Sequence, residues 1–267
     1  MGRTIFIGDV HGCREELAEL MAVLQPHPGA DRVIFVGDLV NKGPDSLGVL
    51  RDVQRILRTF PGSVCVSGNH EEKALRDVKK GNNEGCPGEP WLFEATLDDL
   101  GFMDSMPLTW YDPELNIRVV HGGIFPALLE KHPDAFARIE ARGNAWRKGG
   151  GKVMNRARRM LRVRYVDAAT GDMLALGENK PDDPFWGDVY NGAQGHVIYG
   201  HSPLLDGNAR EDDYATGIDT ACVFGACLTA MVVTPDSPAP NDWSFRYVTA
   251  MARQQYREPY KEGEEDE

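Results

Sequence analysis

Seven acidic, amide and imidazole side chains stand just after short apolar segments of the chain, each close to a glycine. They lie in Gly8-Asp9-Val10-His11-Gly12, Gly37-Asp38, Gly68-Asn69-His70, His121-Gly122 and Gly200-His201. Carboxylate, imidazole and amide oxygen ligands suit divalent metals such as Mn, Fe, Zn or Co. No cysteine belongs to the set, which argues against a structural zinc site. We therefore expect a site for divalent metal ions.

Such side chains meet only if the strands before them end at one place. In open α/β sheets, functional groups gather beyond the carboxyl ends of the strands, and glycine lets the backbone turn sharply there. Two metals that share a carboxylate can clamp both the attacking and the leaving oxygen of a phosphoryl transfer. Each motif alone would be read as an ordinary turn. Five in chain order make that reading remote.

Hydrophobic patterning supplies the strands and helices. It predicts strands at Arg3–Ile7, Arg32–Val36 and Val64–Val66, and helices marked by Leu17 to Leu24, Leu47 to Leu57 and Glu71 to Val78. This alternation is typical of βαβ units. Further strands are predicted at Ile117–Val120, Val197–Tyr199, Cys227–Val233 and Ser244–Thr249, with fewer helices between them. We expect a mixed sheet system with an antiparallel second half.

The rest of the chain is read as loops, a cap and a tail. Gly- and polar-rich runs predict loops at Lys79–Pro90, Gly143–Lys152 and Asp206–Thr216. We expect one domain over residues 1–255, in which residues 126–184 form a partly helical cap. The acidic tail, residues 256–267, is expected to be disordered.

Composition narrows the class of protein. The chain has 267 residues, 41 acidic against 29 basic side chains and a net charge of −12. The acidic balance argues against stable nucleic-acid binding through an overall positive field. No apolar run approaches the length of a membrane span, so no membrane partner is expected. The five cysteines are scattered, without a CxxC pair, as in reduced cytoplasmic proteins, and we expect a cytoplasmic location.

The motifs in order, GDVHG, GDLVNKGPDS, GNHE, HGG and a late GH, resemble the calcineurin-like metallophosphoesterases of the phosphoprotein-phosphatase type. The resemblance runs from Thr4 to about Val233 and implies a β-sandwich of mixed sheets flanked by helices. It also implies two divalent transition-metal ions, with Mn favoured and Co, Fe or Zn as alternatives. One ion would be held by Asp9, His11 and Asp38. The other would be held by Asp38, Asn69, His121 and His201, while His70 would protonate the leaving group.

Two residues depart from the protein phosphatases of this family, which read GDxVDRG. Asn41 replaces the second Asp, and Lys42 replaces the Arg. An amide cannot raise the basicity of His70 as a carboxylate would. Because a nucleoside diphosphate leaves more readily than a serine alkoxide, the change favours cleavage of a phosphoanhydride. Loss of the Asp, together with GPDSLGVL and GIDTACVFGACLTAMVV, resembles the symmetrical bis(5′-nucleosyl)-tetraphosphatase branch.

Basic residues crowd the predicted cap between Asn155 and Tyr165. A solvated helix face would explain them, but in so acidic a chain the cluster is suited to receive a polyphosphate. We select Arg162 and Arg164, with Lys42, as phosphate contacts.

The expected activity is symmetrical cleavage of diadenosine tetraphosphate to two ADP, by in-line attack of a metal-bound hydroxide on phosphorus. The substrate would thus be a dinucleoside polyphosphate or another phosphorylated compound. The alternatives are a serine/threonine or broad-specificity phosphoprotein phosphatase with the same metals, a protein with both activities, and a nucleotide sensor without catalysis. A sensor has no need of the complete ligand set.

Overall fold

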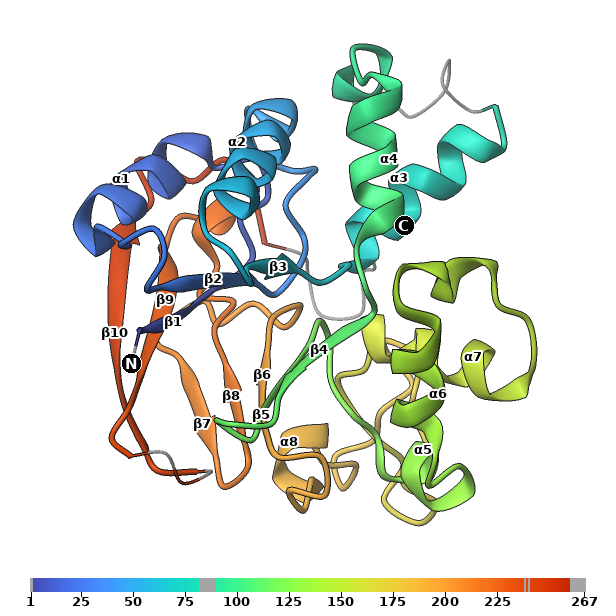
Figure 1. The fold of residues 1–267 in the computed structure, drawn as a ribbon. Coiled ribbons are helices and arrows are strands. Elements are labelled where there is room, and N and C mark those ends of the chain that lie inside the picture. Colours follow the sequence, from blue (N-terminus) through green and yellow to red (C-terminus); the bar gives the residue numbers. More distant parts are fainter. Residues whose placement is uncertain (1, 82–89, 238, 240, 260–267) are drawn as a thin grey trace.

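Two mixed sheets form the centre of the molecule. The computed structural model describes residues 2–81, 90–237, 239 and 241–259. Within these residues, one five-stranded sheet has the order β10-β9-β1-β2-β3, and a second has the order β4-β5-β6-β8-β7 (Figure 1). The strands of the first sheet are β1 (Thr4–Ile7), β2 (Arg32–Phe35), β3 (Val64–Cys65), β9 (Cys227–Pro235) and β10 (Trp243–Met251). Those of the second are β4 (Thr109–Asp112), β5 (Ile117–Val120), β6 (His196–Tyr199), β7 (Arg210–Asp212) and β8 (Ala215–Gly217).

The sheets face each other across an apolar layer, because successive side chains of a strand point to opposite faces. Phe6 of β1, Ile34 of β2, Ile117 of β5 and Ile198 of β6 belong to one fully buried cluster between the sheets. The alternate residues of the same strands pack outward on helices. Both faces of the central strands are therefore covered, which explains their nearly continuous apolar runs in the sequence.

Helices cover the outer faces (Figure 1). On the first sheet lie α1 (Arg14–Leu24) and α2 (Ser46–Thr59), joined in one core by side chains of α3 (Asn69–Lys79) and α4 (Leu97–Ser105). On the second sheet lie α5 (Pro126–Lys131), α6 (Ala135–Arg142), α7 (Lys152–Ala157) and the short α8 (Trp186–Val189). The architecture agrees with the predicted sandwich of mixed sheets flanked by helices.

Strand direction brings the predicted site together. In the first sheet β1, β2 and β3 run parallel, and in the second β5, β6 and β8 run parallel. The expectation of an antiparallel second half is confirmed for β9 and β10, which pair antiparallel, and is wrong for β5, β6 and β8. The reason is the long connection through α5 to α8, which returns the chain to the starting end of the sheet before β6 begins.

Two loop predictions are also wrong in part. The segment Asp206–Thr216 contains β7 and most of β8, and Gly143–Lys152 contains a 3₁₀ helix over Gly143–Lys148. The strands are only three residues long, so pairing with neighbours rather than their own pattern decides their conformation. Helix α4 and strand β4 were not predicted.

Some predictions fall on residues outside the described part. These are residues 82–89 of the predicted loop Lys79–Pro90 and residues 260–267 of the predicted tail. Earlier in that tail, Tyr256 and Arg257 donate backbone N–H groups to the carbonyl of Val223. Among the helices of the described residues, none has the length and apolar character needed to cross a membrane.

Candidate metal centre

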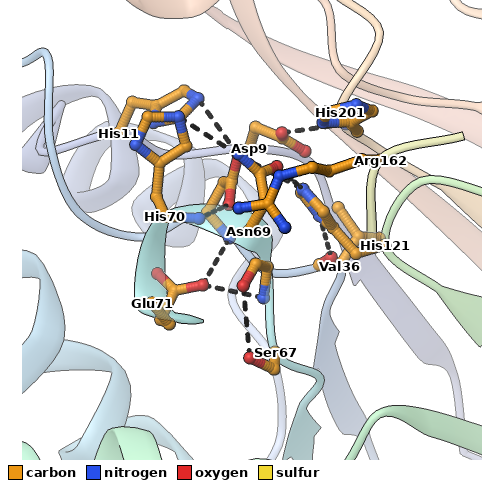
Figure 2. Close-up of polar contacts among 12 residues, drawn as sticks. Asp9, His11, Val36, Ser67, Asn69, His70, Glu71, His121, Arg162 and His201 are labelled. Carbon is orange, nitrogen blue, oxygen red and sulfur yellow. Dashed lines mark hydrogen bonds and ion pairs between the residues drawn. The ribbon is translucent and has the colours of Figure 1, made fainter. Parts of the chain in front are cut away.

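The seven side chains predicted for the metal centre lie just beyond the ends of strands. Asp9 and His11 follow β1, Asp38 follows β2, and Asn69 with His70 follows β3. From the second sheet, His121 follows β5 and His201 follows β6. Figure 2 shows the labelled side chains converging on one point from these separate segments. All seven are at least nine-tenths buried.

The carboxylate of Asp38 is the centre of the group. Its Oδ2 lies 3.2 Å from His121 Nε2, 3.6 Å from His11 Nε2 and 3.9 Å from His70 Nε2. Its Oδ1 accepts a hydrogen bond from the backbone N–H of His70 at 3.0 Å. Two sets of candidate ligands therefore share it: His11 with His70, and His121 with His201.

The backbone fixes the orientation of two imidazoles. Nδ1 of His121 lies 2.8 Å from the carbonyl oxygen of Val36, and Nδ1 of His11 lies 3.0 Å from that of Val40. Since a carbonyl oxygen only accepts, each Nδ1 carries the proton, and a neutral ring presents a lone pair at Nε2. Nε2 of His121 faces oxygen atoms of both Asp38 and Asn69, the latter at 3.0 Å. A cation satisfies such a gathering of lone pairs.

Two further buried side-chain atoms at the site lack a hydrogen-bond partner in the described structure. Asp9 Oδ1 and His201 Nε2 have no hydrogen-bond partner within the described structure, although the backbone N–H of His201 donates to Asp9 Oδ2 at 2.9 Å. Buried polar atoms left without partners are costly and rare. Together with the lone pairs around Asp38, these atoms fit the binding of divalent cations.

Electrostatics favours the same interpretation. Burial, with the carboxylates of Asp219 and Asp38 nearby, raises the pKa of Asp9 well above its ordinary value. Burial lowers the pKa of both His11 and His201, and this keeps them as neutral rings that can bind a metal. Burial also acts to lower the pKa of His121, but the adjacent carboxylate of Asp38 outweighs it and raises that pKa. Burial would also raise the pKa of Asp38, but the adjacent imidazoles, led by His121, hold it well below its ordinary value. The grouped carboxylates therefore favour the binding of a positive charge, such as a metal cation, at the centre.

The backbone at the site is strained. His11, Asp38 and His201 have φ values of 44°, 50° and 67°, in the left-handed region that side chains with a Cβ avoid. Such conformations cost about 1–3 kcal/mol each and concentrate at functional sites. These three are predicted metal ligands, and Asn41 and Lys42, which also lie at the site, have φ values of 71° and 70°.

Glycines at the strand ends allow the loops to approach each other. A Cβ on Gly68 would lie 2.0 Å from Asp38 Oδ1, and one on Gly200 would lie 1.9 Å from Asp9 Oδ1. Neither contact is possible between real atoms. Gly68 and Gly200 are thus needed to leave room for the carboxylates of Asp38 and Asp9.

Sequence reasoning missed two buried carboxylates that support the site. Glu71 accepts hydrogen bonds from the backbone N–H groups of Asp38, Leu39 and Gly68, at 3.0, 2.8 and 2.8 Å. It therefore ties the loop after β2 to the start of α3. Its place at the third position of a helix, after Gly68, was a readable capping signal. The second, Asp219, lies just beyond β8 and is 5% exposed, and burial raises its pKa. In the sequence, the only sign of its role was its position two residues after a short strand.

His70 differs from the other imidazoles in its Nδ1 partner. The indole N–H of Trp91, which can only donate, lies 2.9 Å from Asn41 Oδ1. The amide nitrogen of Asn41 is therefore the atom that faces His70 Nδ1, at 3.0 Å, and it must donate. Neutral His70 then carries its proton on Nε2, toward Asp38 and the pocket. This tautomer is a proton donor and not a metal ligand.

A pocket opens over the centre. It is lined by Asp38, Asn69, His70 and His201, by the cations Lys42, Arg162 and Arg164, and by the apolar side chains of Tyr165, Leu174 and Phe224 among others. Lys42 Nζ lies 3.2 Å from His11 Nε2, and Arg164 contacts the carbonyl oxygen of His201 at 3.1 Å. Arg162 contacts Glu72 at 3.2 Å, and Figure 2 shows its side chain beside the histidines.

The neighbouring arginines of the cluster have structural partners. Arg156 and Arg159 both pair with Asp172, and Arg158 donates to backbone carbonyls, among them that of Arg147 at 2.6 Å. They are absent from the described lining of the pocket. The location of Arg162 and Arg164 thus agrees with their selection from the cluster, while their contact with phosphate stays a prediction.

Comparison with known proteins identifies the family and several similar proteins. The profile of the calcineurin-like phosphoesterase family matches residues 2–225. The chain is 28% identical over 244 residues to an asymmetrical bis(5′-nucleosyl)-tetraphosphatase of Oceanobacillus iheyensis, a match that covers 84% of this chain and 86% of that protein. It is 29% identical over 259 residues to a symmetrical bis(5′-nucleosyl)-tetraphosphatase of Coxiella burnetii, with coverage of 85% and 87%. The crystal structure of a candidate diadenosine tetraphosphatase matches with a TM-score of 0.66 and 27% identity, over 93% of this chain and 94% of that one.

The close approach of Gly200 to Asp9 leads to a prediction. Gly200→Ala should displace the Asp9 carboxylate and weaken Mn²⁺ binding about tenfold or more, the usual effect of disturbing the surroundings of a metal ligand. Titration with Mn²⁺, followed by calorimetry, measures the change. Gly150→Ala is the control, because a Cβ there would contact nothing within 4 Å. Unchanged Mn²⁺ affinity in the folded Gly200→Ala protein would contradict the assignment of Asp9.

Proposed function

This chain belongs to the calcineurin-like phosphoesterase family, and from that premise we propose that it is a two-metal hydrolase that cleaves diadenosine tetraphosphate symmetrically into two ADP. Membership and the tetraphosphatase relatives indicate a hydrolase of phosphate compounds. The relatives include both symmetrical and asymmetrical enzymes, so they leave the position of cleavage open. The support for symmetrical cleavage comes from the pocket.

The family implies divalent metal ions, and the donor set fits them. Asp9, His11 and Asp38 would hold one ion. Asp38, Asn69, His121 and His201 would hold the other, with the carboxylate of Asp38 shared. Mn²⁺ is the proposed metal, because the set mixes carboxylate, imidazole and amide oxygen without sulfur. When bound, the ions would supply an activated water and neutralise charge on the phosphoryl oxygens.

One observation carries the choice of substrate: the Asn41 amide donates to Nδ1 of His70. A carboxylate at this place would accept a hydrogen bond from the Nδ1–H group and stabilise the charged imidazolium, which is a strong acid catalyst. With the amide, His70 offers the N–H of a neutral ring. Such a donor can assist departure of ADP, which needs little protonation, far better than departure of an alkoxide. The site therefore suits a phosphoanhydride more than a phosphoserine.

The pocket has the charges that a polyphosphate requires. Lys42 lies on the His11 side of the centre, Arg164 lies on the His201 side, and Arg162 completes the cationic lining. A tetraphosphate cut at its middle must place two phosphates on each side of the broken bond, and positive charge is available on both. Tyr165, Leu174 and Phe224 offer an apolar wall for a nucleoside.

The product pattern tests the proposed function. With Mn²⁺ supplied, chromatography of the reaction products should show two ADP from each diadenosine tetraphosphate. Production of ATP plus AMP would contradict symmetrical cleavage. Faster release of phosphate from a phosphoserine peptide than of ADP from the dinucleotide would instead favour the phosphoprotein phosphatase.

The two cap arginines should matter mainly for the long substrate. Arg162→Ala combined with Arg164→Ala should lower kcat/KM for diadenosine tetraphosphate about 100-fold, since hydrogen bonds to charged groups contribute roughly 1.5–3 kcal/mol each. Nitrophenyl phosphate, which has a single phosphate, should lose much less. Arg138→Ala is the matched control, because Arg138 lies on the exposed face of α6 and pairs with the exposed Asp134. Equal losses for both substrates would show that these arginines only maintain the fold or the metals.

The contact between the Asn41 amide and His70 predicts a substitution that increases relative activity toward an alkyl phosphate. Asn41→Asp should raise the ratio of kcat/KM for an alkyl phosphate to that for diadenosine tetraphosphate about tenfold, because the carboxylate would stabilise imidazolium and strengthen the acid. Metal content should stay unchanged, and Asn41→Ala should give no such gain. If Asn41→Asp slows both substrates to the same extent, the partner of His70 Nδ1 does not set the preference for the leaving group.

A further inference from the structure

A second cluster of potential metal ligands lies in the apolar core that α1 shares with the first sheet. It consists of Cys13, Glu16 and Cys222, and it shares no residue with the centre described above. Both sulfur atoms and one carboxylate oxygen of Glu16 lie within 4.8 Å of one another. Each cysteine is at most 2% exposed, and Glu16 is fully buried. A carboxylate is rarely placed in such a core without a strong partner.

The two carboxylate oxygens of Glu16 differ in their hydrogen bonding. Oε1 accepts hydrogen bonds from the backbone N–H of Arg253 at 3.0 Å and from the hydroxyl of Tyr256 at 2.7 Å. Oε2 is buried and has no hydrogen-bond partner in the described structure. Donors that hold one oxygen and leave the other available are the usual support of a carboxylate that binds a metal.

The thiols lack strong partners and are poorly placed for oxidation. Apart from its contact with Cys222, Cys13 Sγ makes a long contact, 3.8 Å, with the carbonyl oxygen of His11. A hydrogen bond with Cys13 and burial raise the pKa of the Cys222 thiol well above its ordinary value. Because oxidation proceeds from accessible thiolates, a redox switch is disfavoured. A bound cation would instead deprotonate the thiols during folding and balance their charge.

We propose that Cys13, Glu16 and Cys222 bind one thiophilic divalent cation, Zn²⁺, as a structural ion separate from the catalytic pair. Two thiolates and a carboxylate are a ligand set that zinc accepts. Cys13 directly follows the loop that carries Asp9 and His11, and Cys222 begins the 3₁₀ helix that follows Asp219. The ion would join these two loops to the C-terminal segment that Glu16 holds. This inference does not depend on which phosphate compound the protein cleaves.

Cobalt substitution of the full-length protein tests the proposal. Thiolate ligands give Co²⁺ an intense near-ultraviolet charge-transfer band, whereas the oxygen and nitrogen ligands of the catalytic centre do not. The wild-type protein loaded with Co²⁺ should show this band, and Cys13→Ser and Cys222→Ser should each weaken or abolish it. Cys227→Ser is the matched control: this buried cysteine lies five residues from Cys222, outside the cluster, and should leave the band intact.

Zinc content gives a second readout. After reconstitution with Zn²⁺ and removal of loosely bound metal, the wild type should retain one more ion per chain than Cys222→Ser. Glu16→Gln, which keeps an oxygen for Arg253 and Tyr256, should retain the band but bind Zn²⁺ about tenfold more weakly.

Absence of the band in Co²⁺-loaded wild type would overturn the proposal whether or not any variant folds. A band that persists at full strength in Cys222→Ser, or recovery of Cys13 and Cys222 as a disulfide from the purified protein, would overturn it as well. These results leave the hydrolysis of diadenosine tetraphosphate untouched, so the two proposals fail separately.

Discussion

The buried carboxylate of Asp38 is the interaction on which the rest of the site depends. Imidazoles from both sheets approach its Oδ2, and the backbone of α3 holds its Oδ1. Glu71 fixes the backbone of the same residue, and Gly68 leaves the room it needs. Because the two sheets contribute residues on opposite sides of Asp38, the sandwich must pack correctly before the centre exists. The strained backbone at Asp38 is maintained by that packing.

The partner at Nδ1 decides what each imidazole can do. Backbone carbonyls accept from Nδ1 of His11 and His121, so Nε2 of these rings presents a lone pair. An amide nitrogen donates to Nδ1 of His70, so its Nε2 carries a proton. In the proposed function, atoms outside the centre thus suit rings of one type, a few ångströms apart, to metal binding or to proton donation. Trp91 contributes to the tautomer of His70, because its indole N–H fixes the orientation of the Asn41 amide.

Much of this could be predicted from the sequence, because the glycine motifs follow apolar strands. The alternation of strand and helix placed β1, β2, β3, β5 and β6, and with them the seven side chains at their ends. The short strands β7 and β8 were missed, since three residues carry no periodic pattern, and Asp219 beyond β8 was missed with them. Trp91 could not be connected to Asn41 because fifty residues separate them and only the fold brings them together. The same holds for Glu16, whose partner Tyr256 lies 240 residues away.

The central claim, that one carboxylate serves two metal ions, is tested most directly by counting metals in Asp38→Asn. Inductively coupled plasma mass spectrometry on wild type and variant, each reconstituted with Mn²⁺, gives the Mn²⁺ content per chain. Removing a shared charged ligand should deprive both ions of an essential contact, so the folded variant should lose most of its bound Mn²⁺ together with turnover. A variant that retains two Mn²⁺ per chain, or that loses only one while hydrolysis continues, would contradict the account.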